Sequence, residues 1–196
     1  MARWEADPRG RLERAALELF TERGYDQTTV AQITERAGLT ERSFYRHYAD
    51  KREVLFGGGE ELEKHLVAAV GDAGAGLAPL DALITALQAA EAVFRPRDAA
   101  RKRRDAIAAN PALYERELIK LASLSAALAD TLARRGVDAR TAQLATDMAM
   151  SVFRLAFERW IAEDDAHFAA LVRESAHELR QVANTTGSGP SSSPTR

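Results

Sequence analysis

The sequence predicts an all-α protein of about nine helices, and three observations lead to that fold class. Ala and Leu dominate the apolar residues, whereas residues that favour strands, such as Val, Ile, Tyr and Trp, are few. Apolar side chains recur at spacings of three and four along much of the chain. Several of these segments begin at an N-cap Asp, Asn or Thr and end at Gly. A chain of 196 residues is long enough for one large or two small domains.

The composition excludes several classes of function. The chain has no Cys, which rules out disulfides, Cys-ligated zinc and thiol catalysis and makes a reducing cytoplasm the expected compartment. The first ten residues lack the apolar core of a secretory signal. No apolar run approaches the roughly 18 residues that span a bilayer, so no membrane partner is expected. The net charge of -2 gives no general attraction to nucleic acid.

The first helix is expected to begin at Asp7-Pro8, with Asp as N-cap and Pro in the first turn, and to end at Gly24. A second helix begins at Thr29, where Thr29 and Gln32 form a capping box. Three side chains of this second helix are expected to be buried: Val30, Ile33 and Ala37.

A turn at Gly38 separates the second helix from a short third helix, which is capped by Thr40 and reaches about Tyr45. Two short helices joined in this way form a helix-turn-helix, whose second helix lies in a DNA groove. Positive charge is local here: residues 39–52 contain four basic and two acidic side chains, plus His47. A fourth helix is expected to open at Asp50 and to be interrupted at residues 57–59, either by a kink or by a hinge between two domains.

Residues 71–79 are predicted to be a linker, and five further helices follow it. Proline- and glycine-bounded patterns place them at 81–94, 98–109, 110–135, 138–164 and 167–183. The helix at 138–164 is apolar on two sides, so both sides are expected to be covered. The tail, residues 185–196, is rich in Gly, Ser and Pro and is expected to be disordered.

Several features over residues 9–56 occur together in a fixed order. They are Gly24-Tyr25, Thr28-Thr29, Ala37-Gly38, Phe44-Tyr45, Tyr48 and Lys51. In these features the segment resembles the DNA-binding domain of the TetR (tetracycline-repressor-like) family of transcription regulators. Residues 103–136 and 152–164 are similar to a C-terminal domain of the acyl-CoA-like ligand-binding type, found in regulators of the mycofactocin system. The resemblance implies a helix-turn-helix domain over 1–56 and an effector-binding and dimerisation domain over 57–184.

The resemblance also implies two kinds of DNA contact. The residues expected to hold the DNA backbone are Thr28, Thr29, Tyr45, His47 and Lys51. The residues expected to face the bases are Thr40, Glu41, Arg42 and Ser43, with Arg42 able to bind guanine through two hydrogen bonds. Phe44 is expected to pack in the core, and Tyr48 is left open between the core and the DNA backbone.

The expected partners are double-stranded operator DNA, a second copy of the chain and a small-molecule effector. One such domain buries too little surface for specific binding, so a dimer with half-sites about one turn (roughly 34–36 Å) apart is expected. Its interface would be formed by the helices at 138–164 and 167–183. The candidate residues for the effector pocket are Phe94, Arg103, Ile107, Leu113, Tyr114, Leu118, Met148, Phe153 and Trp160.

A basic cluster at residues 95–104 has six basic residues and one acidic residue. It is open to three interpretations: a solvated helix face, a patch that flanks DNA, or a site for the phosphates of an anionic ligand such as a fatty acyl-CoA. The last would suit the resemblance of the C-terminal part.

The sequence leaves two alternatives to a ligand-responsive repressor. One is a helical DNA-binding protein without effector control. The other is a helical metal-dependent enzyme, which needs paired Glu-x-x-His motifs. Only Glu174 and His177 form one, and residues 57–59 lack the Lys-Ser/Thr of a phosphate-binding loop. We therefore expect no catalytic residue, metal or cofactor.

Overall fold

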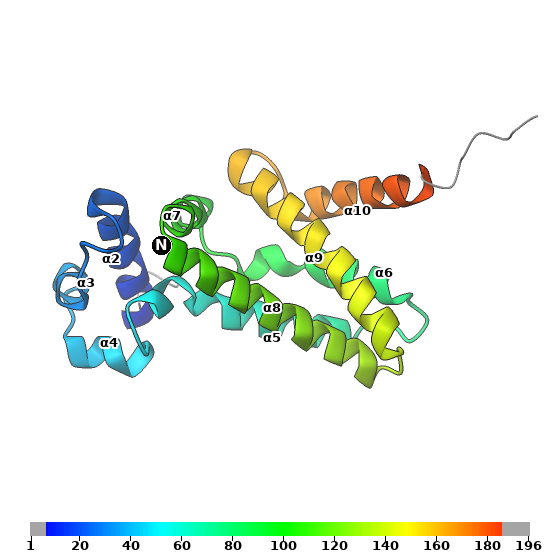
Figure 1. The fold of residues 1–196 in the computed structure, drawn as a ribbon, viewed down its shortest axis with the longest axis horizontal. Helices are drawn as coiled ribbons and strands as arrows, with labels where there is room; N and C mark the ends of the chain where they lie inside the picture. The colour runs from blue at the N-terminus through cyan, green and yellow to red at the C-terminus, as the bar shows by residue number, and fades with distance from the viewer. Residues whose placement is uncertain (1–6, 186–196) are drawn as a thin grey trace, which may run out of the picture. The chain divides into compact units, whose positions relative to one another are not determined.

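The computed structural model describes residues 7–185, and over this range the regular structure is helical, which confirms the all-α class. It contains nine α-helices and two 3-10 helices within the described range (Figure 1). These are α2 (Pro8–Arg23), α3 (Val30–Ala37), α4 (Glu41–His47), η1 (Arg52–Leu55), α5 (Gly57–Gly71), α6 (Pro79–Gln88), η2 (Ala90–Val93), α7 (Arg97–Ala108), α8 (Pro111–Arg134), α9 (Ala139–Ala162) and α10 (Phe168–Thr185). The predicted disordered tail lies, except for its first residue, outside the described residues.

The chain divides into two compact units. Unit 1 comprises the residues up to His65 and Ala92–Ala127, and unit 2 comprises Leu66–Glu91 and the residues from Leu128 onward. Helices α5 and α8 each contribute to both units. These compact units do not coincide with the two functional domains predicted from the sequence, which meet at residue 56. The predicted domain boundary stays a prediction. Within residues 7–185, every helix is too short or too polar to span a bilayer.

The predicted caps of α2, α3 and α4 are confirmed in unit 1. Asp7 Oδ1 accepts a hydrogen bond from Gly10 N at 2.6 Å, and the chain leaves α2 at Gly24 with φ 82°. Thr29 and Gln32 form both bonds of the capping box, at 3.0 and 3.2 Å. Gly38 has φ 62° and ψ 42°, a left-handed conformation that strongly favours glycine and allows the sharp turn into α4.

The predicted fourth helix starting at Asp50 is wrong. Asp50 Oδ1 does accept from the backbone N–H groups of Arg52 and Glu53, at 2.8 and 3.2 Å. However, the turn that follows is the 3-10 helix η1, and α5 begins only at Gly57. Residues 54–56 are all buried, and an amphipathic α-helix cannot bury three successive side chains on one face. The three glycines therefore form the first turn of α5 and do not interrupt a longer helix.

The core of unit 1 joins α2, α3, α4 and η1 to α7 and the start of α8. Its buried cluster includes Leu12, Ile33, Phe44, Ile107 and Leu113. Helix α2 contacts α3, α4, η1 and α7. The helix-turn-helix therefore shares one hydrophobic core with segments from the middle of the chain.

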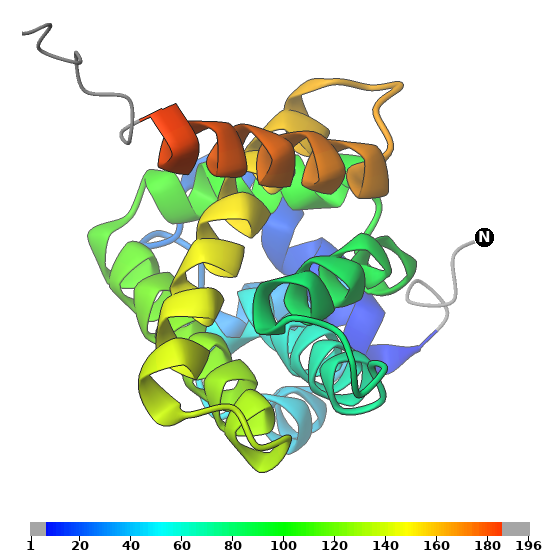
Figure 2. The same ribbon diagram turned by 90° about the vertical axis from the view of Figure 1, so that its right-hand side faces the viewer.

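In unit 2, helices α6, α9 and α10 each pack on the other two. Figure 2 shows α10 (orange to red) crossing α9 (yellow). The rings of Phe153 and Trp160 on α9 both meet Phe168 at the start of α10, at centroid distances of 6.0 and 6.4 Å. The predicted helix at 81–94 is in fact two elements, because α6 ends at Gln88 and η2 follows.

Candidate nucleic-acid interface

Helix α4 is fixed at its start and along one face. Thr40 Oγ1 accepts from Ser43 N at 3.2 Å and caps the helix, as predicted. Phe44 is fully buried and points into the core of unit 1, which confirms its expected packing role. The remaining surface of α4 is polar and accessible. The helix is therefore anchored on one side and exposes the other to solvent.

The residues predicted to face bases lie on this accessible surface. Thr40, Glu41 and Arg42 are exposed, and Ser43 is partly buried. They belong to the first turn of α4 and its N-cap. In a helix that enters the major groove by its N-terminal end, these are the positions that approach base edges. Their contact with bases stays a prediction.

The residues predicted to hold the DNA backbone fall into two groups. Thr29 and Tyr45 are exposed, with Tyr45 56% accessible, and His47 is partly buried. Thr28, by contrast, is buried, and its hydroxyl donates to Gly24 O at 2.8 Å. The Thr28 hydroxyl therefore joins the start of α3 to the end of α2 and is turned away from solvent.

Lys51 holds the loop before α3. Its Nζ donates to Tyr25 O at 2.7 Å and to Thr28 O at 2.8 Å, and it lies 4.0 Å from the centroid of the Tyr25 ring. Burial lowers the pKa of Lys51, against the opposing effect of Asp26. Two of its three donors are used in this way, which leaves one for a phosphate. Lys51 thus positions the start of α3 relative to the turn after α4.

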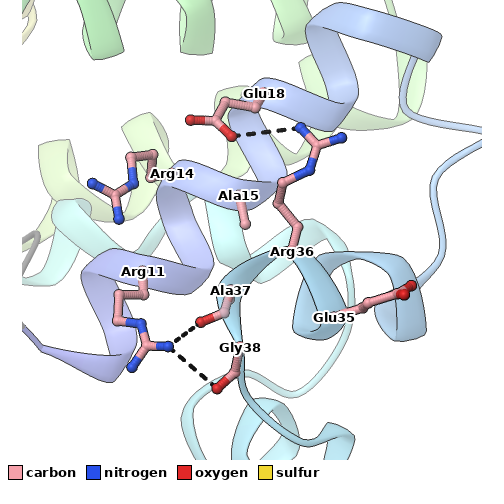
Figure 3. A pocket seen from close by; sticks show the side chains of 8 residues that line it. All are labelled: Arg11, Arg14, Ala15, Glu18, Glu35, Arg36, Ala37 and Gly38. Atoms are coloured by element: carbon pink, nitrogen blue, oxygen red, sulfur yellow. Dashed lines mark hydrogen bonds and ion pairs between the residues drawn. The ribbon is translucent and has the colours of Figure 1, made fainter.

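Two arginines outside the predicted set of DNA contacts also position α3. Arg11 Nη2 donates to the backbone oxygens of Ala37 and Gly38, at the C-terminal end of α3 (Figure 3). Arg36 binds both carboxylate oxygens of Glu22, at 2.6 and 2.8 Å. A cationic side chain satisfies the unpaired carbonyls at a helix C-terminus and opposes its negative dipole end. Periodicity carries no signal for such contacts, because the partners lie on different helices.

A surface cavity of about 300 Å³ lies between α2 and α3 beside these contacts. Its lining includes Arg11, Arg14, Glu18 and Arg36, and Figure 3 shows Arg36 turned toward Glu18. Because both signs of charge line it and its arginines bond to the protein, it is explained by the packing of the helix-turn-helix.

Tyr48 ends α4 in the interior of unit 1. Its side chain is only 4% exposed, and its hydroxyl donates to Glu13 Oε1 at 3.0 Å. Glu13, itself 6% exposed, also accepts from Arg95 Nε at 2.9 Å. The choice left open for Tyr48 is therefore decided in favour of the core. Glu13 was not among the predicted site residues, and Arg95 was predicted only as part of the basic cluster at 95–104, without this partner.

The nine residues predicted for an effector pocket are distributed over both units. Ile107 and Leu113 belong to the hydrophobic core of unit 1, whereas Tyr114 and Leu118 are exposed. Phe94 and Arg103 complete the set in unit 1, and the three in unit 2 are Met148, Phe153 and Trp160. A second cavity, of about 240 Å³, lies in unit 1 around Phe20 and Tyr25, and none of the nine lines it.

The basic cluster at 95–104 is largely ion-paired. Arg101 pairs with Asp98, and Arg104 with its neighbour Asp105. Arg103 donates to Leu55 O at 2.7 Å and to both oxygens of Glu117, at 2.6 and 3.2 Å. This pattern favours the solvated, ion-paired helix face over a phosphate site. Within the described part of the chain, no group of three or more His, Asp or Glu is placed to hold a metal ion.

The sequence of the N-terminal part matches one family of regulators. Residues 13–56 match the family model described as bacterial regulatory proteins, tetR family. Over 81 residues the chain is 41% identical to the HTH-type transcriptional regulator TcmR of Streptomyces glaucescens, covering 41% of this chain and 36% of TcmR. Over 68 residues it is 34% identical to an uncharacterised HTH-type transcriptional regulator of Mycobacterium bovis, covering 35% of this chain and 34% of that protein. The chain thus matches about a third of the length of these relatives.

Solved structures share the fold over most of the chain. A complex of SmeT with triclosan has a TM-score of 0.60 at 19% identity, covering 96% of this chain and 98% of the other. The fatty acid degradation regulator FadR from Bacillus halodurans scores 0.54 at 18% identity, covering 86% and 96%. A transcriptional regulator from Aquifex aeolicus scores 0.54 at 16% identity, covering 90% and 99%. All three are under 25% identical to this chain, so they show a shared fold, while the family match covers residues 13–56.

Proposed function

We propose that this chain is a ligand-responsive transcriptional regulator that binds a palindromic operator as a homodimer. We further propose that it is a repressor, that a small molecule releases it from DNA, and that it acts in the cytoplasm. The observation that carries the DNA-binding role is the anchored helix α4, whose accessible first turn lies in the part of the chain that matches the tetR family. The expected domains, 1–56 for DNA and 57–184 for effector and dimer, are part of this proposal.

The proposed set of DNA-contacting residues is smaller than the set predicted from the sequence. Thr28 and Tyr48 are left out, because their hydroxyls bond to other parts of unit 1. The residues proposed to face the bases are Thr40, Glu41, Arg42 and Ser43. The residues proposed to hold the DNA backbone are Thr29, Tyr45, His47 and Lys51.

Selection of bound DNA from a random pool tests the DNA-binding role. The wild-type protein should enrich sequences with two-fold symmetry, and half-sites should be separated by about one helical turn or a multiple of it. A Glu41→Ala, Arg42→Ala, Tyr45→Ala variant keeps Phe44 and the Thr40 cap and should therefore fold, but it should not enrich the same sequences. Absence of any enriched sequence with the folded wild-type protein would reject the proposal.

The dimer proposal is supported by an apolar surface on unit 2. Leu144 and Leu155 are 62% and 46% exposed on α9, and Val182 is 68% exposed on α10. Residues 144 and 155 are eleven positions apart, close to three helical turns, so they lie on one side of α9. Among residues 7–185 this side of the two-sided helix is left exposed at Leu144 and Leu155, and exposed apolar patches mark protein interfaces.

Sedimentation of suitable variants tests the dimer. Leu144→Glu with Leu155→Glu places two charges on the proposed interface and should give a monomer at micromolar concentration, where the wild type is a dimer. Leu118→Glu is the matched control, because Leu118 is similarly exposed, at 49%, but lies in unit 1. A monomeric wild type, or a double variant that sediments as the wild type does, contradicts the proposal.

The effector is proposed to be a small molecule, and a fatty acyl-CoA is the specific candidate. This rests on the resemblance of residues 103–136 and 152–164 to domains of the acyl-CoA-like ligand-binding type. Titration of the protein–operator complex with a long-chain acyl-CoA should release DNA, whereas coenzyme A alone should not. DNA that stays bound at saturating acyl-CoA rejects this candidate, and other small molecules can then be tested in the same assay.

A further inference from the structure

A buried carboxylate lies at the centre of a polar network in unit 1. Glu13, on α2, is 6% exposed and accepts hydrogen bonds from two side chains that lie far from it in the sequence. Tyr48 donates to Oε1 at 3.0 Å. Arg95 donates through Nε to Oε2 at 2.9 Å and through Nη2 to Oε1 at 3.2 Å. Arg9 Nε lies 3.7 Å from Oε1.

The Tyr48 end of this network belongs to the DNA-recognition helix. Tyr48 is the C-cap of α4, and its backbone N–H donates to Phe44 O at 2.9 Å. Its ring lies 5.4 Å from the ring of Phe44, the apolar anchor of α4. Glu13 thus fixes the C-cap of the helix whose first turn is proposed to face the bases.

The Arg95 end belongs to the segment that precedes α7. Arg95 binds Glu13 through two nitrogens, the forked geometry that holds a carboxylate in one orientation. Its Nη1 also lies 3.4 Å from Glu61 Oε2 on α5. The surroundings are closely packed, because a Cβ added at Gly57 would come within 2.7 Å of Glu13 Oε1.

The same short segment is held at its other end within unit 2. Glu91 accepts from Trp160 Nε1 at 3.3 Å and from the backbone N–H of Phe168 at 3.0 Å. Glu91 thereby joins the end of α9 to the start of α10. The chain passes from unit 2 to unit 1 between Glu91 and Ala92. Four residues after Glu91, Arg95 binds inside unit 1, so each end of the segment is bonded within a different unit.

We propose that Arg95 is a positioning residue for DNA binding, and that Glu91–Arg95 carries changes in the α9–α10 packing to the recognition helix. When Glu91 shifts with α9 or α10, Arg95 shifts as well, because only three residues connect the two. The ion pair between Arg95 and Glu13 then weakens, and with it the hydrogen bond between Tyr48 and Glu13. The proposal rests on the DNA-binding function proposed above and adds the residues through which that function is regulated.

The strength of the effect follows from the chemistry of an ion pair whose carboxylate is buried. Removing one partner of a buried ion pair leaves the other as an uncompensated charge, which is far less favourable than either the intact pair or an apolar replacement. Two states of α4 that differ in this pairing will therefore differ in population. Coupling between sites typically changes affinity by about 5- to 150-fold, which is the range expected for DNA affinity here.

The first experiment compares full-length Arg95→Ala and Arg95→Lys with Lys64→Ala on DNA enriched by the wild type. Lys64 is an exposed cation of unit 1, so its loss removes the same charge without touching the network. Arg95→Ala should weaken binding about tenfold or more. The slope of log affinity against log salt should stay unchanged, because Arg95 neutralises no phosphate. Arg95→Lys should restore part of the affinity, and Lys64→Ala should bind as the wild type does.

The second experiment tests the segment through a double-mutant cycle of Glu91→Gln and Tyr48→Phe, read out as DNA affinity. These residues belong to different units, so additive effects would be expected without coupling. If the double variant loses less affinity than the sum of the losses in the two single variants, the proposal is supported. If the losses add, the proposal is overturned.

The failure of this proposal is distinct from failure of the proposed function. If the wild type enriches no DNA sequence, the proposed function has failed. If the wild type binds and Arg95→Ala binds equally well, the positioning role of Arg95 is overturned, whatever the variant's thermal stability. If Arg95→Ala does not fold, the comparison of Arg95→Lys with Lys64→Ala decides in the same way.

Discussion

The hydroxyl of Tyr48 donates a hydrogen bond to Oε1 of Glu13 at 3.0 Å, between two side chains that are almost completely buried. The contact joins α2 to the C-cap of the helix that is proposed to enter DNA. A short helix such as α4 cannot be positioned by its own hydrogen bonds, so its placement depends on contacts of this kind. Phe44 anchors α4 by apolar packing, and Tyr48 adds a hydrogen bond, which also fixes orientation.

Tyr48→Phe should destabilise the protein by about 1–3 kcal/mol, because it removes a hydrogen bond from a buried carboxylate. Tyr45→Phe is the control, since Tyr45 is 56% exposed and should tolerate the change within about 0.5 kcal/mol. Chemical denaturation of both variants measures the difference. Equal unfolding free energies for the two variants would show that the hydrogen bond of the Tyr48 hydroxyl does not stabilise the protein.

Gly57→Ala and Gly59→Ala should differ, although both glycines lie in the first turn of α5. A Cβ at Gly59 meets nothing within 4 Å, so alanine there should stabilise by about 0.4–1 kcal/mol through the lower entropy of the unfolded chain. A Cβ at Gly57 would lie 2.7 Å from Glu13 Oε1 and 2.9 Å from Arg9 Nη2, so the network must shift. We expect Gly57→Ala to lose this gain and to weaken DNA binding. Thermal denaturation and DNA titration of the pair check this, and equal behaviour would count against it.

Lys51→Ala should destabilise unit 1 by about 1–3 kcal/mol, because two backbone oxygens lose a charged donor at once. Lys102→Ala, at an exposed position of α7, removes the same charge and should change stability by less than about 0.5 kcal/mol. Urea denaturation compares the two. Hydrogen exchange at residues 24–30 should also become faster in Lys51→Ala alone. Unchanged exchange there would contradict the positioning role of Lys51.

The acid sensitivity of the protein should depend on Glu53. Burial acts to raise the pKa of Glu53, but Arg116 and Lys120 outweigh it and hold the pKa below its ordinary value of 4.5. A carboxyl group with a lowered folded pKa stabilises the fold above its unfolded pKa, and this contribution is lost as the pH falls through the folded pKa. The wild type should therefore lose stability below about pH 4.5 more steeply than Arg116→Ala, by up to about 1 kcal/mol.

Denaturation curves between pH 3 and 6 measure that difference. Arg140→Ala is the control, because Arg140 is exposed at the start of α9 and belongs to unit 2. It should follow the wild-type pH dependence. Parallel curves for all three proteins would mean that the Glu53 contacts contribute nothing to acid stability.

The sequence predicted the ends of helices correctly where a residue has a single local role, such as an N-cap or a left-handed turn. The Asp7, Thr29 and Thr40 caps and the turn at Gly38 are of this kind. Asp50 was interpreted wrongly because the same side-chain bond begins an α-helix or a 3-10 turn. The choice between them was made by the burial of residues 54–56, which depends on the tertiary fold.

Contacts between distant residues could not be predicted from one sequence. Glu13 and Arg95 are 82 positions apart, and nothing in the neighbourhood of either one indicates the other. Spacing also failed to separate core residues from surface residues among the pocket candidates. Leu113 and Tyr114 are adjacent and both largely apolar, yet one is fully buried and the other is 55% exposed.

The base specificity of Arg42→Ala, measured at every position of the enriched operator, tests the central proposal of a dimer that reads DNA through α4. The variant should lose about 1–3 kcal/mol of discrimination at one base pair in each half-site. The two positions should be equidistant from the centre of the operator, because a two-fold dimer places both copies of Arg42 symmetrically. Unchanged specificity, or relaxation at a single unpaired position, would contradict the account.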